Sequence, residues 1–263
     1  MQLRRSREAR GLSQVKLARL MQYSDSYLSS IERAERNPTL ELAQRADAEL
    51  DTGGTLELMF WQIGNRAFIE GFPEYAVAEG KAEVIRLYER VIPHGLLQVP
   101  EYTAELERAA VERGSATAEQ AAERAAHLQA RQAAALERTR PPLIHAVLDE
   151  SCLYTQVGGR EVLGRQLAHL EELSCRPNVI LQVAPFEMGA TQPFLHAITL
   201  LAMPDGTVLG YTETHQRGYL ERDKGSVAAW GRDYDRLQVD ALSRTSSRAL
   251  IRRARKELSH DGT

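Results

Sequence analysis

The chain has 263 residues, of which 43% are hydrophobic and 26% charged, a balance typical of a globular protein with a buried core. Its formal net charge is only −3, so any case for nucleic-acid binding must rest on a local motif. Two cysteines, without a CxxC or Cys/His cluster, indicate neither a disulfide framework nor structural zinc. We find no secretory signal and no apolar run of about 18 residues, and therefore expect a cytoplasmic protein without membrane association.

Residues 1 to about 60 predict five short helices separated by caps and turns. Gly11 suits the end of a first, basic helix, and Ser13 and Ser24 are good N-caps for the second and third. Two more helices are expected at about 40–50 and 55–64, after Pro38-Thr39 and a glycine-rich turn. The first 60 residues therefore predict a small all-helical domain.

The second and third of these helices have the pattern of a DNA-reading motif, in which the second helix of a pair enters the major groove. Ala18 is small enough for the helix crossing, and Tyr23 can supply an apolar contact in the turn. Leu28 and Ile31 have the spacing of buried anchors. The outward positions of the helix at about 24–34 should be polar, and we assign to them Asp25, Ser26, Ser29 and Ser30, with Arg33 at the far end.

Local charge supports the same interpretation. Residues 1–24 contain six basic side chains and one acidic side chain, a local charge of +5 that suits phosphate contacts. Gln14 begins the second helix and could donate to a phosphate beside free backbone N–H groups. The predicted DNA-binding residues are Ser13, Gln14, Lys16, Ser24, Asp25, Ser26, Tyr27, Ser29, Ser30 and Arg33.

Residues 3 to about 59 resemble the XRE (Cro/repressor-type) helix-turn-helix family of transcriptional regulators. The residues that carry the resemblance are Leu12-Ser13-Gln14, Leu17-Ala18, Ser24, Tyr27-Leu28, Ile31-Glu32-Arg33 and Pro38. It implies that Gln14 contacts DNA and that Asp25, Ser26 and Ser30 approach base edges. Glu32 is expected to brace the fold rather than to contact DNA. Where the family often has glycine, this chain has Gln22 and Ala34; a left-handed backbone at Gln22 would cost roughly 1–2 kcal/mol.

Residues 61–263 predict a larger α+β domain. We expect helices at 82–91, at 117–138, at about 161–173 and in the basic tail from about 240. Short β-rich runs are expected at 143–149, 178–185, 195–203 and 207–213, the last two forming a hairpin around Pro204-Asp205-Gly206. The predicted fold class is therefore mixed, a helix-turn-helix domain followed by an α+β effector domain.

This larger domain resembles the effector domain of the WhiJ-like, antitoxin-like regulators. The similarity runs from about 85 to 252 through VIPHGLLQVPEYTAEL, RPPLIHAVLDESCLYTQVGG, QLAHLEELSCRPNVILQVAPFEMGA and DALSRTSSRALI. It implies control of development or secondary metabolism, and a small acidic or antitoxin-like partner protein encoded nearby. Repressor-type modules usually act as two-fold dimers, so we also expect a homodimer on double-stranded DNA.

Candidate partner or ligand contacts lie in three places in this domain, each with an alternative structural interpretation. The apolar loop with Leu96, Leu97 and Tyr102 docks either on a partner or on its own core. Arg131-Gln132 with Asp149-Glu150 form either a polar pocket or buried pairs that brace the fold. Phe186, with Met188, Phe194 and Tyr211, lines either a ligand pocket or the core.

The residues do not predict an enzyme. Cys152 lacks a motif that would supply a base and an oxyanion donor, so it is better interpreted as a packed small hydrophobe. We expect no cofactor and no metal. The leading hypothesis is a DNA-binding regulator whose larger domain dimerises and receives a signal. The alternatives are an antitoxin-like interaction protein that mainly holds a small partner, and a small-ligand-gated switch.

Overall fold

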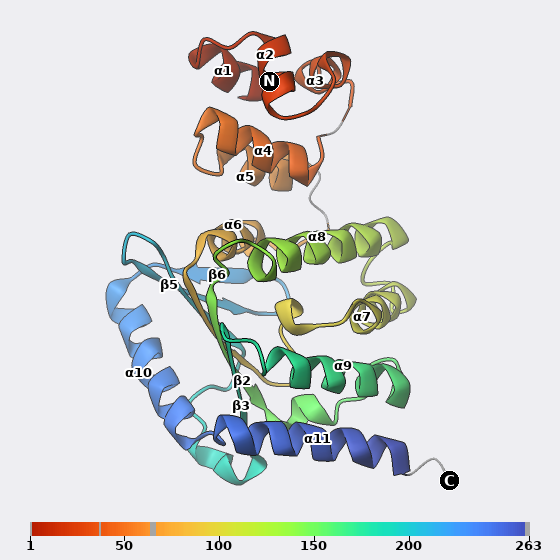
Figure 1. Cartoon of the computed structure of the whole chain (residues 1–263), viewed down its shortest axis with the longest axis vertical. Helices are drawn as coiled ribbons and strands as arrows, with labels where there is room; N and C mark the ends of the chain where they lie inside the picture. Colours follow the sequence, from red (N-terminus) through yellow and green to blue (C-terminus); the bar gives the residue numbers. More distant parts are fainter. Residues whose placement is uncertain (1, 37, 64–66, 261–263) are drawn as a thin grey trace. The chain divides into compact units, whose positions relative to one another are not determined.

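The chain divides into two compact units, residues 1–66 and residues 67–263, in a computed structural model that describes residues 2–36, 38–63 and 67–260 (Figure 1). The first unit is all-helical, and the second combines a sheet with helices. The expected fold class, helical and then α+β, is confirmed.

The first unit contains five described helices, at the expected places. They are α1 (Gln2–Ala9), α2 (Gln14–Leu20), α3 (Asp25–Glu32), α4 (Leu40–Leu50) and α5 (Thr55–Ile63). Their inward side chains form one apolar cluster, in which Leu17, Leu28 and Leu42 are almost fully buried. Each of α2, α3 and α4 begins at a hydroxyl that accepts a backbone N–H three residues on, which satisfies one unpaired donor of the first turn.

The second unit is built on a six-stranded sheet in the order β3-β2-β1-β4-β5-β6. Its strands are β1 (Val84–Glu89), β2 (Leu143–Asp149), β3 (Val179–Ala184), β4 (Ile198–Ala202), β5 (Val208–Glu213) and β6 (Gly218–Glu221). The first three strands run parallel and are joined by helical crossovers, whereas β4, β5 and β6 pair antiparallel. The expected hairpin of β4 and β5 is confirmed.

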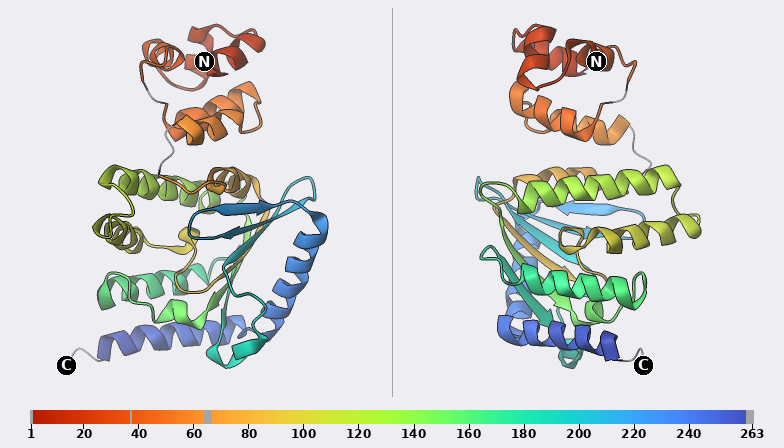
Figure 2. Two further views of the ribbon diagram at one scale, coloured as in Figure 1. Left: turned by 180° about the vertical axis from the view of Figure 1, so that it is seen from behind. Right: turned by 45° about the vertical axis from the view of Figure 1, so that its right-hand side comes forward.

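Helices cover both faces of this sheet. They are α6 (Phe72–Lys81), α7 (Pro100–Glu112), α8 (Ala118–Leu136), α9 (Gly159–Leu173), α10 (Lys224–Asp240) and α11 (Arg244–His260), with short 3-10 helices η1 (Gly95–Leu97), η2 (Glu150–Leu153) and η3 (Phe186–Thr191). Figure 2 shows α7, α8, α9 and α11 stacked on one side and α10 on the other. Side chains alternate accordingly, because Ile85 and Leu87 face the first group while Tyr88 packs with Val227 and Tyr234 of α10.

One predicted element is wrong in type. The sequence predicts a helix at 82–91, but Val84–Glu89 form β1, which pairs with β2 on one side and β4 on the other. Two neighbouring strands satisfy its backbone groups, and the helices on the two faces of the sheet bury Ile85, Leu87 and Tyr88. Together these interactions outweigh local helix propensity. Helices α6, α7 and α10 and strand β6 are not predicted from the sequence, whereas α8, α9, α11 and the first five helices are.

Candidate functional site

Helices α2 and α3 form a capped helix-turn-helix. The Ser13 hydroxyl accepts the Lys16 N–H at the start of α2, and the Ser24 hydroxyl accepts the Tyr27 N–H at the start of α3, each at 3.2 Å. Ala18 is fully buried among the other inward residues of the pair. These local features hold the first turn of α3 in a fixed place.

The turn between these helices bends through a left-handed residue. Gln22 has a φ of 60°, and the bonds from Gln22 N–H to the Arg19 carbonyl and from Tyr23 N–H to the Ala18 carbonyl form a Schellman motif. The end of α3 repeats this motif at Ala34, with a φ of 59°. The left-handed backbone anticipated at Gln22 is therefore present, at a position that glycine would occupy without strain.

Glu32 braces the motif from within, as expected. Its carboxylate accepts two bonds from Arg7, at 2.7 and 2.9 Å, and one from the Gln14 side chain at 2.9 Å. The Glu32 carboxylate thereby joins α3 to α1 through a buried ion pair and to α2 through a hydrogen bond. The Gln14 amide has two N–H groups, so the second can still donate to a phosphate.

The outward face of α3 differs from the prediction at one residue. Ser24, Asp25 and Ser26 are exposed and Ser29 is partly exposed, so their side chains can be reached by a ligand. Ser30, however, is buried and its hydroxyl donates to the Tyr27 carbonyl at 2.7 Å, so the expectation that it faces outward is wrong. The hydroxyl is turned back onto the preceding turn of its own helix, a common local bond of serine in helices, so it is not available to a base edge.

Basic side chains near the motif are less free than the local charge of +5 suggests. Arg7 is buried against Glu32, Arg4 pairs with Glu8, and Arg10 pairs with Asp51. Arg33 pairs with Glu35 and also donates to the Ser29 hydroxyl. Among the residues that the structure describes, the basic side chains outside such pairs in α1 and α2 are Arg5, Lys16 and Arg19.

In the second unit, the loop with Leu96, Leu97 and Tyr102 belongs to the core. All three side chains are fully buried in the cluster beneath α8 and α9. The interpretation that this loop docks on its own domain is confirmed. These side chains therefore offer no surface to a partner.

Of the two interpretations of Arg131 and Glu150, the shared polar pocket is not formed, and each side chain has its own separate partner. Arg131 pairs with Glu79 of α6, whereas the Glu150 carboxylate accepts the Phe186 N–H at 2.9 Å. The two side chains belong to different clusters because α8 packs against α6 and η1, while Glu150 follows β2. Phe186 is 58% exposed and stacks on Tyr154, so it lines no core. Met188 and Phe194 are core residues, and Tyr211 lines the cavity described next.

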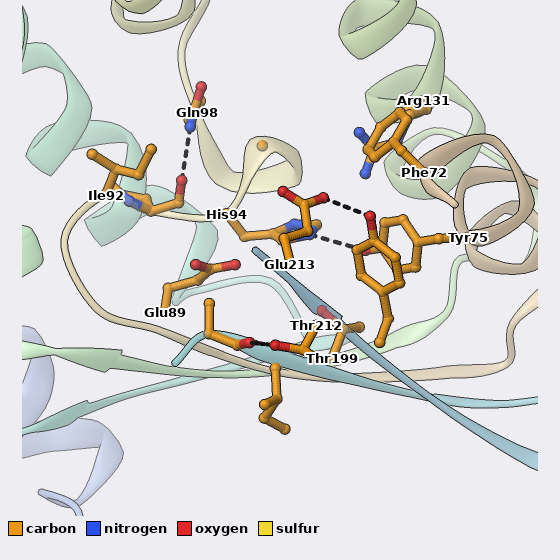
Figure 3. A pocket seen from close by; sticks show the side chains of 15 residues that line it. Phe72, Tyr75, Glu89, Ile92, His94, Gln98, Arg131, Thr199, Thr212 and Glu213 are labelled. Atoms are coloured by element: carbon orange, nitrogen blue, oxygen red, sulfur yellow. Dashed lines mark hydrogen bonds between the residues drawn. The ribbon is translucent and has the colours of Figure 1, made fainter. Parts of the chain in front are cut away.

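A cavity of about 210 Å³ lies between α6, α8, the loop after β1 and strands β4 and β5 (Figure 3). Its walls combine aromatic rings with carboxyl groups, and they include Phe72, Tyr75, Glu89, Ile92, His94, Gln98, Arg131, Thr199, Tyr211 and Glu213. The rings of Tyr75 and Tyr211 stack with centroids 3.9 Å apart. A second cavity of about 320 Å³ shares Phe72, Arg131 and Glu213 with the first.

A hydrogen-bond chain lines one wall of this cavity. Leu96 N–H donates to Nδ1 of His94 at 3.3 Å, so the proton of the neutral ring lies on Nε2, which donates to the Tyr75 hydroxyl at 3.0 Å. That hydroxyl in turn donates to Glu79 at 2.6 Å. Burial lowers the pKa of His94 to about 4, so the ring is neutral near pH 7. Burial alone would raise the pKa of Glu79, but the Arg131 guanidinium outweighs it and holds that pKa below its ordinary value.

Two other carboxyl groups line the cavity, and neither is paired with an arginine of the described chain as Glu79 is. Glu213 is exposed at the end of β5 and accepts the Tyr211 hydroxyl at 2.7 Å. Glu89, at the end of β1, is partly buried, and among the described residues no hydrogen-bond or ion-pair partner reaches its carboxyl group. Burial, with Glu213 nearby, raises the pKa of Glu89 well above its ordinary value.

Two family models match the chain. Residues 72–253 match the model described as "Domain of unknown function (DUF5753)", and residues 3–54 match the model described as "Helix-turn-helix". The chain belongs to the DUF5753 family. Its helix-turn-helix is of the XRE type, which makes the protein a DNA-binding regulator. Neither the curated proteins nor the solved structures include a significant match.

Cys152 of the DUF5753 domain is a core residue, as the sequence suggests. It is fully buried, and burial raises the pKa of its thiol well above the ordinary value, so the reactive thiolate does not form near neutral pH. His145 faces the opposite side of the sheet and bonds Gln182 at 2.9 Å. Within the described ranges, no helix is long and apolar enough to cross a bilayer, and no group of three His, Cys, Asp or Glu side chains could hold a metal ion.

Most of the cavity residues of the DUF5753 domain escape prediction from the sequence. Arg131 and Tyr211 are among the candidates named from it, but Tyr75, Glu89 and Glu213 are not. The strand endings Tyr88-Glu89 and Thr212-Glu213 carry the available signal, a carboxyl group directly after a buried stretch. That signal is hidden at Glu89, because the local pattern of residues 82–91 favours a helix.

Proposed function

We propose that this DNA-binding regulator reads its operator with the first turn of α3 and that its DUF5753 domain dimerises and receives a signal. The observation that carries the DNA contact is the exposed row Ser24, Asp25 and Ser26 at the capped start of α3. Their short polar side chains suit hydrogen bonds to base edges, and Lys16 and the Gln14 amide suit phosphates. Ser13, Tyr27, Ser29 and Arg33 lie at the rim of this surface in the proposal, and Ser30 is left out of it.

The test is a gel-shift titration of the purified protein with the DNA upstream of its own gene at low salt. Ser26→Ala should weaken binding by about 1 kcal/mol because it removes one hydrogen bond to a base. Gln14→Ala should weaken it because the phosphate and Glu32 both lose a donor. Matched controls are Ser115→Ala and Gln129→Ala, both exposed in the other unit. The proposal fails if no upstream DNA is retarded, or if the controls weaken binding as much as the test variants.

The resemblance to the WhiJ-like regulators supports a role in development or secondary metabolism. The quoted segments run from about 85 to 252, within the DUF5753 match at 72–253. A deletion of the gene should then alter the timing of differentiation or of metabolite production. Unchanged timing in the deletion strain would contradict this role.

The cavity between α6, α8 and the sheet supports signal reception. It has a defined polar wall, and its lining comes from elements far apart in the chain. Occupancy can therefore couple α6 and α8 to β4 and β5. Dimerisation is supported by the usual two-fold use of repressor-type modules, and light scattering of the full chain tests it, with a monomer as the contradicting result.

A second candidate function, holding a small partner protein, is favoured by one surface feature. Phe186, 58% exposed, stacks on Tyr154, 39% exposed, and both follow strands at the same edge of the sheet. Co-expression with the small protein encoded beside the gene should yield a complex that Phe186→Ser weakens and Tyr219→Ser, an exposed aromatic on β6, does not. Absence of a complex, or equal weakening in both variants, counts against this function.

A further inference from the structure

The cavity contains more carboxyl groups than cations. Arg131 is its one lysine or arginine among the described lining residues, and its two donors to Glu79, at 2.7 and 2.8 Å, are used in that pair. The His94 ring is neutral near pH 7. Glu89 and Glu213 therefore face the cavity without a cation of the described chain paired to either.

An unpartnered carboxyl group in this position is costly for the protein. Glu89 is partly buried, so its carboxyl group loses part of its hydration, and no donor among the described residues replaces it. Figure 3 shows the Glu89 carboxyl group pointing into the space of the cavity, with no interaction drawn to the other lining residues. A ligand with N–H donors and a positive charge would supply the interactions that the chain itself does not.

The remaining walls indicate what else such a ligand carries. Phe72, Tyr75 and Tyr211 present aromatic surface, and Ile92 adds an aliphatic side chain. Aromatic faces attract cations and also pack against apolar groups. The volume of about 210 Å³ exceeds the roughly 150 Å³ of a cavity that holds benzene. A ring-sized apolar body with one ammonium group therefore fits.

We infer that this cavity binds a small protonated primary amine, whose N–H groups donate to the carboxylates of Glu89 and Glu213. The apolar body of the amine packs between Phe72, Tyr75 and Ile92. The ligand class deepens the signal-receiving role proposed above and rests on it for its regulatory meaning. Binding itself is a property of the DUF5753 domain, and it is measured without DNA.

Amine binding should release protons. The titratable and charged groups that line the cavity or act on Glu89 are Tyr75 on α6, His94 after β1, Arg131 on α8, Cys152 in η2, and Tyr211 and Glu213 on β5. Glu79 on α6 bonds Tyr75 and Arg131. An ammonium group beside Glu89 lowers the raised pKa of that carboxyl group, so the bound form carries fewer protons. An alkyl amine resembles the lysine side chain, with an ordinary pKa of about 10.4, and stays charged up to pH 8. Affinity should therefore rise from pH 5 to pH 8.

The test uses the full chain and two probes of similar shape in isothermal titration calorimetry. Benzylamine carries the ammonium group and a ring, and benzyl alcohol replaces the charge with a hydroxyl. We expect benzylamine to bind at least about tenfold more tightly than benzyl alcohol, as a charge-assisted hydrogen bond predicts. Equal affinity for the two probes, or no binding of benzylamine, overturns the inference.

Substitutions of the two cavity carboxyl groups test whether benzylamine binds in this cavity. Glu89→Gln and Glu213→Gln keep the shape of each side chain and should each weaken benzylamine binding about tenfold or more. Glu187→Gln, exposed on η3, is the matched control and should leave it unchanged. Binding that neither test variant weakens overturns the assignment. If benzylamine binds here but leaves operator affinity unchanged, the signal-receiving role fails while the site stands; if no operator is bound at all, the DNA proposal fails separately.

Discussion

At the scale of single residues, the pair of Glu79 and Arg131 decides how α6 and α8 meet. Glu79 is 2% exposed, and the Arg131 guanidinium also lies over the rings of Phe72 and Tyr75, 5.0 and 5.7 Å from their centroids. Two planar donors on one carboxylate satisfy its charge and fix its orientation. The wall of the cavity is therefore set by a buried ion pair that water cannot replace.

Arg131→Met should destabilise the second unit by about 3–5 kcal/mol, because Glu79 is left as a buried charge without a partner. Urea unfolding followed by circular dichroism measures the change. Arg165→Met is the control, since Arg165 is exposed and its pair with Glu161 contributes at most about 1 kcal/mol. An equal loss in the free energy of unfolding in both variants would show that the buried pair of Glu79 and Arg131 stabilises the fold no more than the exposed pair does.

The raised pKa of Glu89 predicts that the stability of the fold depends on pH. Its pKa is raised in the folded chain above the ordinary value, so folding is favoured by protonated Glu89 and this contribution disappears as pH rises through the folded-state pKa. Glu89→Gln removes the titration. The melting temperature of the variant, relative to the unchanged protein without ligand, should therefore increase between pH 5 and pH 8. A difference that stays constant over this range would contradict the assignment of Glu89 as a partly buried carboxyl group with a raised pKa.

At the scale of elements, helices α1, α2 and α3 end in the same type of C-terminal cap, formed by different residues. Each helix ends in a left-handed residue that closes a Schellman motif, namely Gly11, Gln22 and Ala34, with φ angles of 63°, 60° and 59°. Glycine has no Cβ to oppose this conformation, whereas Gln22 and Ala34 do. The motif persists because packing of the helices into one cluster outweighs the local strain.

Gln22→Gly and Ala34→Gly should each stabilise the first unit by about 1 kcal/mol, since strain of roughly 1–2 kcal/mol is relieved at some cost in unfolded-chain entropy. Hydrogen exchange of the α2 and α3 amides in the full chain measures this locally. Gly11→Ala is the control of opposite sign and should reduce protection, although no atom lies within 4 Å of the added Cβ. Reduced protection in Gln22→Gly would show that the Gln22 side chain stabilises the unit by more than the left-handed backbone at this position destabilises it.

Strand β1 illustrates how pairing between distant segments overrides a local pattern. Its sequence, VIRLYE, contains residues that suit either a helix or a strand, and its local pattern favours a helix. The register with β2 and β4 gives every inward side chain a neighbour, with Leu87 opposite Ala146 and Thr199. Long-range pairing of this kind cannot be read from a window of ten residues.

At the scale of the whole molecule, DNA binding must depend on few charges, since the net charge is −3. Arg5, Lys16 and Arg19 are the basic side chains of α1 and α2 that the described structure leaves outside ion pairs. Three phosphate contacts per protomer, doubled in a dimer, predict a fall in affinity of roughly three orders of magnitude between 50 and 200 mM salt. Binding should therefore be steep in salt despite the acidic balance of the chain.

Lys16→Ala should reduce the slope of log affinity against log salt by about two in the proposed dimer, because each of the two protomers no longer neutralises one phosphate. Fluorescence anisotropy with a labelled operator at several salt concentrations measures it. Arg165→Ala, an exposed arginine of α9, is the matched control and should leave the slope unchanged. An unchanged slope in Lys16→Ala would remove this side chain from the proposed interface.

The helix-turn-helix could be predicted almost completely because its signals are local. The caps at Ser13 and Ser24, the small residue Ala18 and the spacing of Leu28 and Ile31 all act within a few residues, and the structure uses each as expected. The prediction is wrong at Ser30, whose hydroxyl is turned back onto its own helix. The cavity could be predicted only in part, since Tyr75, Glu89, Arg131 and Glu213 come from four separate elements.

Local sequence was enough for the fold class, the positions of most helices, the β4–β5 hairpin and the motif of a DNA-binding regulator, because caps, turns and periodicity act between near neighbours. Only the three-dimensional structure shows which charged side chains are paired and which are not. The fold buries Arg7 on Glu32 and Arg131 on Glu79, leaves Glu89 without a partner among the described residues, and places Leu96, Leu97 and Tyr102 in the core. Burial and pairing depend on residues far apart in the chain, which meet only once the sheet and its helices have assembled.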